Sequence, residues 1–169
     1  MASFEVEQWL PLALSKVFAF FSYPENLPRI MPPEVHVRLI KAALIPPSIS
    51  LPILDLDKAA GAGSEFVFSF RPLPFIPVTT RWHARIEEYE PERYFRDIQL
   101  RGPMKRWSHR HEFQAERREG VDGTLIGDRV EFEIGYGWAG RILEQYLVLP
   151  AMRQSFERRQ ELVREALQS

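Results

Sequence analysis

The stretch Arg81–Phe113, RWHARIEEYEPERYFRDIQLRGPMKRWSHRHEF, decides the fold. Polar and apolar residues alternate along three runs, which is the pattern of a strand with one buried face. Glu-Pro at 90–91 and Gly-Pro at 102–103 separate these runs, and both pairs have the chemistry of tight turns. The stretch therefore predicts three consecutive strands joined by short turns.

The same patterns continue toward both ends of the chain. Alternation predicts further strands, and apolar residues spaced i, i+3, i+4 and i+7 predict helices. We expect strands at 4–10, 35–44, 64–72 and 124–137, a helix at 12–22, a helical turn at 24–33, and a long helical region from 138 onward. This order of one strand, two short helices, about six strands and one long C-terminal helix contains no linker or repeat, so it predicts a single domain over residues 1–169.

Composition excludes several classes of protein. The chain has 169 residues, of which 45% are hydrophobic and 27% charged, and its net charge is -1. These values are ordinary for a globular domain and provide no basic field for nucleic acid. The absence of cysteine excludes disulfides, thiol catalysis and cysteine-bound metal. Neither a signal-peptide pattern nor an apolar run of about 20 residues occurs, so we expect a cytoplasmic protein without a transmembrane segment.

Four segments of the chain resemble the START/Bet v 1-like (SRPBCC) superfamily and, within it, the cyclase/dehydrase-like branch. They are VFAFFSYPENLPRIMPP at 17–33, the stretch 81–113, GTLIGDRVEFEI at 123–134 and SFERR at 155–159. The resemblance implies an α+β helix-grip fold, in which a curved antiparallel sheet of six to seven strands wraps around a long C-terminal helix. It also implies a mostly apolar cavity between the two. Members of the superfamily bind lipids, sterols, quinones, polyketides or hormones, and only some are enzymes.

Two of the four histidines, His109 and His111, lie one residue apart. Alternate residues of a strand share a face, so both histidines point the same way as Trp107 and Phe113. Arg110, between them, points to the opposite face. This division of the basic residues between two faces argues against a nucleic-acid interface, which needs clustered charge.

The turns predict which residues lie opposite these histidines. If the Gly-Pro turn centres its hairpin, Asp97 lies opposite His109. The following hairpin places Asp128 opposite His111, also facing inward. An inward carboxylate is stabilised by a partner, which suggests Asp-His pairs. The predicted polar band, within an otherwise apolar wall, consists of Asp97, Gln99, His109, His111 and Asp128.

The polar band has four interpretations. It forms a hydrogen-bonded network that fixes the sheet register, as most buried polar groups do, or it orients a mostly apolar ligand in a cavity. Alternatively, His109 or His111 acts as an acid-base group that Asp97 or Asp128 orients. His-x-His with nearby carboxylates also suits zinc or iron. We expect no metal, because the two aspartates already serve as histidine partners.

Large aromatic side chains predict the wall of such a cavity, although each of them also fits an ordinary core. Arg159 follows Phe156 in the last helix. It either reaches an acidic group, such as Asp97, Asp128 or a ligand carboxylate, or lies on the surface as most arginines do. Besides the polar band, the candidate ligand-binding residues are Phe66, Phe68, Phe70, Trp82, Phe95, Trp107, Phe132, Phe156 and Arg159.

The apolar, proline-rich loop Ile45–Pro52 also has several interpretations. It forms a lid over the cavity mouth, makes a transient contact with a membrane or a partner, or simply packs against the domain. The sequence does not choose among them.

These observations predict a protein that binds a small hydrophobic molecule, of a lipid, quinone or polyketide-like kind, between the sheet and the last helix. We expect no cofactor. The rival hypotheses are an enzyme of the cyclase or dehydratase kind and an interaction or regulatory module with a collapsed cavity. The fold alone does not choose among them, because it hosts many functions. The oligomeric state is left open by the sequence.

Overall fold

The computed structural model describes residues 1–48, 51–71 and 78–168. Among these residues, seven strands form one antiparallel sheet in the order β1-β7-β6-β5-β4-β3-β2. The predicted strands are therefore all present. Their bounds are β1 Ala2–Leu10, β2 Arg38–Ala43, β3 Glu65–Phe70, β4 Thr80–Glu90, β5 Tyr94–Arg101, β6 Arg106–Arg118 and β7 Val121–Glu133.

The helices lie where the apolar spacing predicts them. The first group, after β1, consists of α1 (Leu14–Ser22), the short turn η1 (Pro24–Asn26), α2 (Leu27–Ile30) and the turn η2 (Pro33–Val35). The C-terminal region consists of α3 (Gly137–Leu143), the π-helical turn η3 (Glu144–Val148) and α4 (Leu149–Gln168). Among the described residues, no helix is long and apolar enough to cross a membrane.

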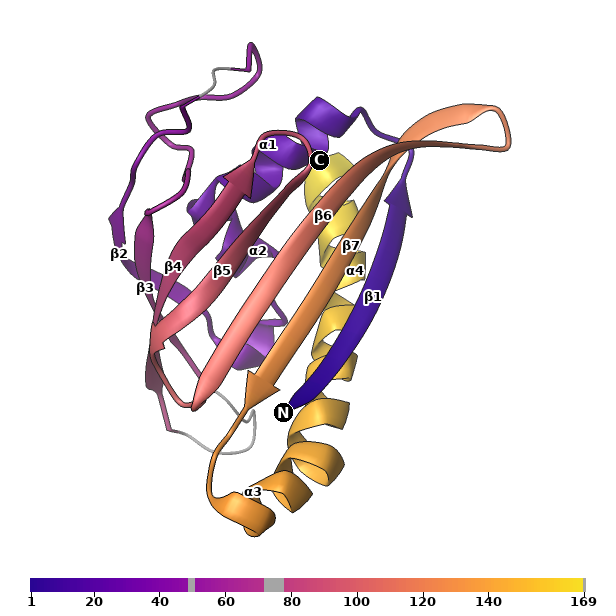
Figure 1. Ribbon diagram of the computed structural model, residues 1–169. Coiled ribbons are helices and arrows are strands. Elements are labelled where there is room, and N and C mark those ends of the chain that lie inside the picture. The colour runs from indigo at the N-terminus through magenta and orange to yellow at the C-terminus, as the bar shows by residue number, and fades with distance from the viewer. Residues whose placement is uncertain (49–50, 72–77, 169) are drawn as a thin grey trace.

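The sheet curves around α4, with α1 and α2 on the same side (Figure 1). Side chains on this inner face form the core, and Phe18 of α1 lies at its centre with no exposed surface. The Phe18 ring makes edge contacts with Tyr89, Phe95 and Phe113, at centroid distances of 5.5, 6.5 and 5.2 Å. Aromatic pairs favour this geometry, so α1 closes the space between the sheet and α4 with close-packed rings.

The strand register agrees with the one predicted from the turns. Asp97 pairs with His109, and Phe95 pairs with His111, in the β5–β6 ladder. His111 pairs with Asp128 in the β6–β7 ladder. Since side chains alternate between the two faces, this register brings both histidines and both aspartates to the inner face of the sheet.

Candidate functional site

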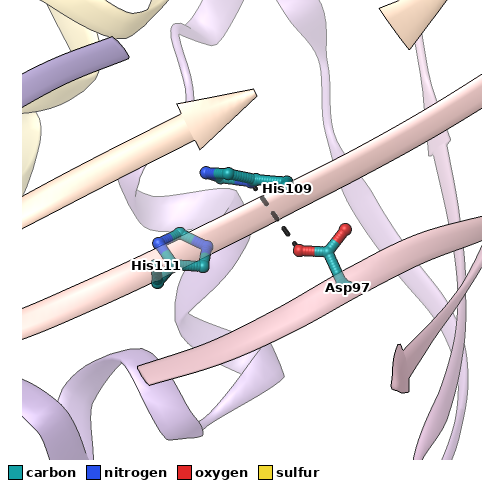
Figure 2. A group of neighbouring side chains, drawn as sticks. All are labelled: Asp97, His109 and His111. Atoms are coloured by element: carbon teal, nitrogen blue, oxygen red, sulfur yellow. Dashed lines mark ion pairs between the residues drawn. The ribbon is translucent and has the colours of Figure 1, made fainter. Parts of the chain in front are cut away.

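A cluster of five polar side chains lies on the inner face of the sheet, against α4. Its members come from four elements and are Asp97 of β5, His109 and His111 of β6, Asp128 of β7 and Arg159 of α4. The two histidines and Arg159 each expose only 5% of their surface. Figure 2 shows Asp97, His109 and His111 pointing toward one another from neighbouring strands. We call these five residues the polar cluster.

Asp128 connects the two histidines. Its Oδ1 lies 2.9 Å from His109 Nε2, which donates a hydrogen bond to it. The same oxygen lies 2.7 Å from His111 Nδ1, but this nitrogen is not aligned for a hydrogen bond. On its other side, His109 Nδ1 lies 3.7 Å from Asp97 Oδ1 (Figure 2), and Asp97 Oδ2 accepts a hydrogen bond of 3.2 Å from Trp107 Nε1. A neutral imidazole has one N–H, so a proton on His109 Nε2 leaves Nδ1 as an acceptor facing Asp97.

The two aspartates have opposite pKa shifts. Burial alone would raise the pKa of Asp128, but the charge of Arg159 and the hydrogen bond from His109 Nε2 outweigh burial and hold it well below its usual range. Burial dominates at Asp97 and raises its pKa, despite the opposing effects of His109 and Trp107. The Asp97 side chain keeps 21% of its surface exposed, which limits this rise. Asp128 is therefore the charged carboxylate of the cluster, and Asp97 is the one that takes up a proton more readily.

His111 is held neutral by its surroundings. Burial and the neighbouring His109 lower its pKa to about 3, and the pull of Asp128 in the other direction is weaker. The His111 ring stacks obliquely on Phe95, with 4.5 Å between centroids, and lies 5.6 Å from the ring of Phe21. With His111 neutral, the charge of Arg159 is the larger electrostatic influence that keeps Asp128 ionised.

Arg159 is the unusual member of the cluster. It is buried, and its Nε has no hydrogen-bond partner among the described residues. The guanidinium carbon lies over the rings of Phe156 and Phe21, 5.2 and 5.7 Å from their centroids. A cation over an aromatic face is stabilised by about 0.5–2 kcal/mol, which is less than the several kcal/mol that burial of a charge costs. Of the two alternatives that the sequence left open for Arg159, an acidic partner or a surface position, the structure contradicts the surface position.

The predicted aromatic wall divides into two groups. Phe95, Trp107 and Phe156 touch the polar cluster, since the Trp107 and Phe156 rings lie 6.0 and 5.3 Å from the ring of His109. The other predicted wall residues pack nearby against one another without a ring contact to the histidines; they are Phe66, Phe68, Phe70, Trp82 and Phe132.

Gln99 does not join the other members of the predicted band. The β5–β6 ladder ends at Ile98, one residue before it. The Gln99 side chain turns back onto the hairpin, where Nε2 donates to the carbonyl of Met104 at 2.6 Å and Oε1 accepts from the Met104 amide at 3.3 Å. Its role in this structure is to hold the turn between β5 and β6.

Phe21 is a member of the site that the sequence analysis did not include. Its ring covers Arg159 and contacts His111 and Phe113. The signal was present in the sequence, because Phe21 follows Leu14, Val17 and Phe18 on the apolar stripe of the first helix. The stripe predicts that Phe21 is buried. Which residues Phe21 contacts, however, depends on where α1 lies against the sheet.

The cluster has only part of the character of a metal site. Among the described residues, Asp97, His109 and His111 offer ligand atoms that lie within 4.8 Å of one another. Asp128 Oδ1, however, is 2.9 and 2.7 Å from the facing nitrogens of the two histidines. Arg159 is also close enough to lower the pKa of Asp128 by its charge, so a cation here meets a positive neighbour. The absence of a metal stays a prediction, and metal analysis of the purified protein tests it.

Two hollows lie on the outside of the molecule. One is lined by Trp9, Pro11, Arg118, Glu119 and Val121, and the other lies on the outer face of the sheet around Tyr94, Arg110 and Glu112. Neither is lined by a member of the polar cluster. The rings of Phe95, Trp107 and Phe156 lie beside the cluster, so a ligand there would contact these rings.

The loop Ile45–Pro52 is described only in part, because residues 49–50 lie outside the described residues. Ile45 is exposed, and its carbonyl accepts hydrogen bonds from the Gly61 amide at 2.8 Å and from Ser64 Oγ at 3.1 Å. Pro47 is buried. The described part of this loop is therefore fixed to the segment before β3, and its role as a lid or contact stays a prediction.

Comparisons with known proteins bear on the fold. No protein-family model matches the sequence, and no curated protein matches it. Among solved structures, the protein TTHA0849 from Thermus thermophilus has a TM-score of 0.66 at 16% identity, covering 98% of this chain and 97% of that one. A START superfamily protein from Mycobacterium smegmatis also has a TM-score of 0.66, at 8% identity, covering 98% of this chain and 97% of that one.

A third similar structure is norcoclaurine synthase from Thalictrum flavum, with a TM-score of 0.59 at 13% identity, covering 96% of this chain and 86% of that one. Identities this low carry an argument about the fold and not about the chemistry. The similar structures span almost the whole chain and share the curved sheet around a C-terminal helix that the sequence predicts. The chain therefore has the helix-grip fold of the START/Bet v 1-like proteins.

Proposed function

We propose that the protein binds a small, mostly apolar molecule with an acidic group between the sheet and α4, where Arg159 pairs with the acid. The observation that carries this proposal is a buried guanidinium whose Nε has no partner among the described residues. Buried polar groups are normally hydrogen-bonded, and a buried charge is normally paired. A ligand carboxylate, phenolate or enolate provides the missing acceptor, and its charge adds to that of Asp128 beside the guanidinium.

The surroundings of Arg159 support an apolar body for this ligand. Phe21 and Phe156 cover the guanidinium, and Phe95 lies on the adjacent histidine. Removal of apolar surface from water contributes about 25 cal/mol per Å², so contact with these rings would supply most of the affinity. The ionic group would set the orientation, as a few placed polar groups do in most ligand sites.

The enzyme hypothesis is weaker on the geometry of the histidines. An acid-base histidine needs a ring nitrogen that is free to face the substrate. His109 has a carboxylate oxygen facing each nitrogen, at 2.9 and 3.7 Å, and His111 Nδ1 lies 2.7 Å from Asp128. These positions support a structural role, in which the two histidines and the two aspartates hold one another in place. The cyclase or dehydratase activity stays an alternative.

The proposal is tested by two matched probes and two matched variants. Dodecanoic acid and dodecanol differ in the acidic group, and the probes are titrated against the protein by calorimetry. Arg159→Met removes the buried cation while keeping its apolar length. Arg158→Met is the control, because Arg158 is the preceding residue of α4, is exposed, and pairs with Glu161.

We expect the acid to bind at least about tenfold more tightly than the alcohol, and this preference to disappear in Arg159→Met but persist in Arg158→Met. Equal binding of the two probes to the unaltered protein would exclude a role for the acidic group of the ligand in binding. If neither probe binds, and the native and denatured masses of freshly purified protein agree, the binding function itself is excluded. A removable excess mass of an organic acid would instead identify the natural ligand class.

A further inference from the structure

An exposed apolar surface lies on the segment between β7 and α4, and none of its residues belongs to the polar cluster. Tyr136, Trp138 and Tyr146 expose 85%, 72% and 79% of their surface. Ile142, Leu143 and Leu147 are exposed beside them. We call these six residues the α3 patch. Contiguous exposed apolar residues of this kind usually mark an interaction site, since isolated ones are common but clusters are not.

The backbone of this segment holds the aromatic rings outward. Tyr136 has a φ of 62°, in the left-handed region that a residue with a Cβ seldom adopts. The next residue, Gly137, begins α3 and also has a positive φ. α3 projects from one end of the molecule, beyond the start of β1 and the end of β7 (Figure 1). The fold thus presents the patch as a separate projection and does not bury it in the core.

The acidic side chain of this segment is withdrawn from the surface. Glu144 is buried, and its Oε2 accepts a hydrogen bond from the Ile134 amide at 3.2 Å. Its Oε1 lies 3.5 Å from the amino group of Met1. Arg141 is exposed within the patch. Between residues 134 and 152, all of which the structure describes, the exposed charge is therefore positive.

Further cations flank the patch. Lys105 lies beside Gly135 and pairs with Glu133 at 2.6 Å, and Arg106 lies 3.9 Å from the same carboxylate. Lys105 and Arg106 thus share the single carboxylate of Glu133, and Arg141 is exposed within the patch, so cations border the apolar residues.

We propose that the α3 patch docks on the surface of a phospholipid bilayer that contains anionic lipids. Trp and Tyr favour the boundary between headgroups and acyl chains, because one end of the ring system is apolar and the other forms hydrogen bonds. Leucine and isoleucine side chains between them enter the apolar layer, and the surrounding cations are attracted to anionic headgroups by about 1 kcal/mol each. Exposed aromatic side chains bordered by cations suit such a surface.

Sedimentation with vesicles tests this proposal. The double variant Trp138→Ser/Tyr146→Ser removes two aromatic members of the patch. Val121→Ser is the control, because Val121 is also exposed but is the first residue of β7, at the other end of the sheet (Figure 1). The vesicles contain phosphatidylcholine alone or phosphatidylcholine with phosphatidylserine, and circular dichroism verifies that each variant is folded.

We expect the unaltered protein and Val121→Ser to sediment with the phosphatidylserine vesicles, and less with the neutral ones. The double variant should remain in the supernatant, with at least about a tenfold loss of partitioning. Protein that stays in the supernatant with both kinds of vesicle would overturn the proposal. So would a dimer, seen by light scattering, that the double variant dissociates, because a second copy would then cover the patch.

Discussion

At the scale of single residues, Asp128 determines the charge of the polar cluster. One of its oxygens faces both histidines, and the charge of Arg159 helps to keep it ionised. Because Asp128 is ionised, His109 has an acceptor for its Nε2 proton. His111 stays neutral in spite of this nearby carboxylate, because its own burial dominates its pKa. The cluster therefore contains an ionised Asp128, the cation of Arg159 and a neutral His111, and this makes its stability sensitive to acid.

The pH dependence of stability tests the state of His111. Its pKa is lowered from 6.5 to about 3 in the folded protein, so between these values the unfolded chain binds a proton that the folded protein does not. The free energy of unfolding should then fall on acidification from about pH 6.5 to pH 3, by up to about 1.4 kcal/mol per pH unit. The raised pKa of Asp97 acts in the opposite direction. The lowered pKa of Asp128 adds to the fall in stability below about pH 3.8, where the unfolded chain takes up a proton that folded Asp128 does not. Urea denaturation across this range measures the slope.

The matched variants for this prediction are His111→Gln and His36→Asn. His111→Gln removes the buried group and should flatten the slope, whatever it does to the absolute stability. His36 is exposed and lies in a left-handed turn, where asparagine is tolerated, so its replacement should leave the slope unchanged. An unchanged slope in His111→Gln would mean that His111 is not the buried neutral group.

At the scale of elements, the hairpin of β6 and β7 is the most regular part of the molecule. Its ladder runs without a shift from Arg106 opposite Glu133 to Arg118 opposite Val121. β1 then pairs with the other edge of β7, and Trp9 of β1 donates a hydrogen bond of 3.0 Å from its Nε1 to the Glu116 carbonyl of β6. The Trp9 ring therefore crosses over β7, which leaves room there only for a glycine.

Two glycines of β7 provide a test of this packing. A Cβ at Gly123 would lie 2.4 Å from the Leu10 carbonyl oxygen and 2.5 Å from the Trp9 ring. A Cβ at Gly127 would lie 3.7 Å from the side chain of Glu112, which is an ordinary contact. We expect Gly123→Ala to lower the free energy of unfolding by about 1–3 kcal/mol, as overpacking does, and Gly127→Ala to change it by less than about 0.5 kcal/mol. Chemical denaturation measures both values, and equal effects would contradict this account.

The same scale explains how much of the site could be predicted from the sequence. Alternation and the position of the turns determine register, so the opposition of Asp97 to His109 and of His111 to Asp128 was predictable. Gln99 differs because the β5–β6 ladder ends at Ile98, and alternation alone does not encode where a ladder ends. The burial of Arg159 and its contact with Phe21 depend on how α1 and α4 lie across the sheet. That placement comes from tertiary packing, and helical periodicity constrains only which stripe faces inward.

At the scale of the whole molecule, the first strand and the last helix meet at one edge of the sheet. β1 is an edge strand, but hydrogen bonds connect it to α4. Gln8 Nε2 donates to the Gln160 carbonyl at 2.7 Å, and Gln160 Nε2 donates to the Glu7 carbonyl at 3.0 Å. Lys16 of α1 donates to the Leu167 carbonyl at 3.1 Å. The opposite edge strand, β2, pairs with β3 alone, and its side chains are almost all exposed.

Native-state hydrogen exchange should therefore distinguish the two edges of the sheet. We expect the ladder amides of β1 to exchange at least about tenfold more slowly than those of β2, because opening β1 also breaks its contacts with α4, whereas β2 opens locally. The amides of β7, which has a paired strand on each side, should be the slowest and should follow the global free energy of unfolding. The comparison is internal, since β1 and β2 are both edge strands of the same sheet. Equal protection of β1 and β2 would show that α4 adds nothing to the stability of this edge, and that strand pairing alone determines the order of opening.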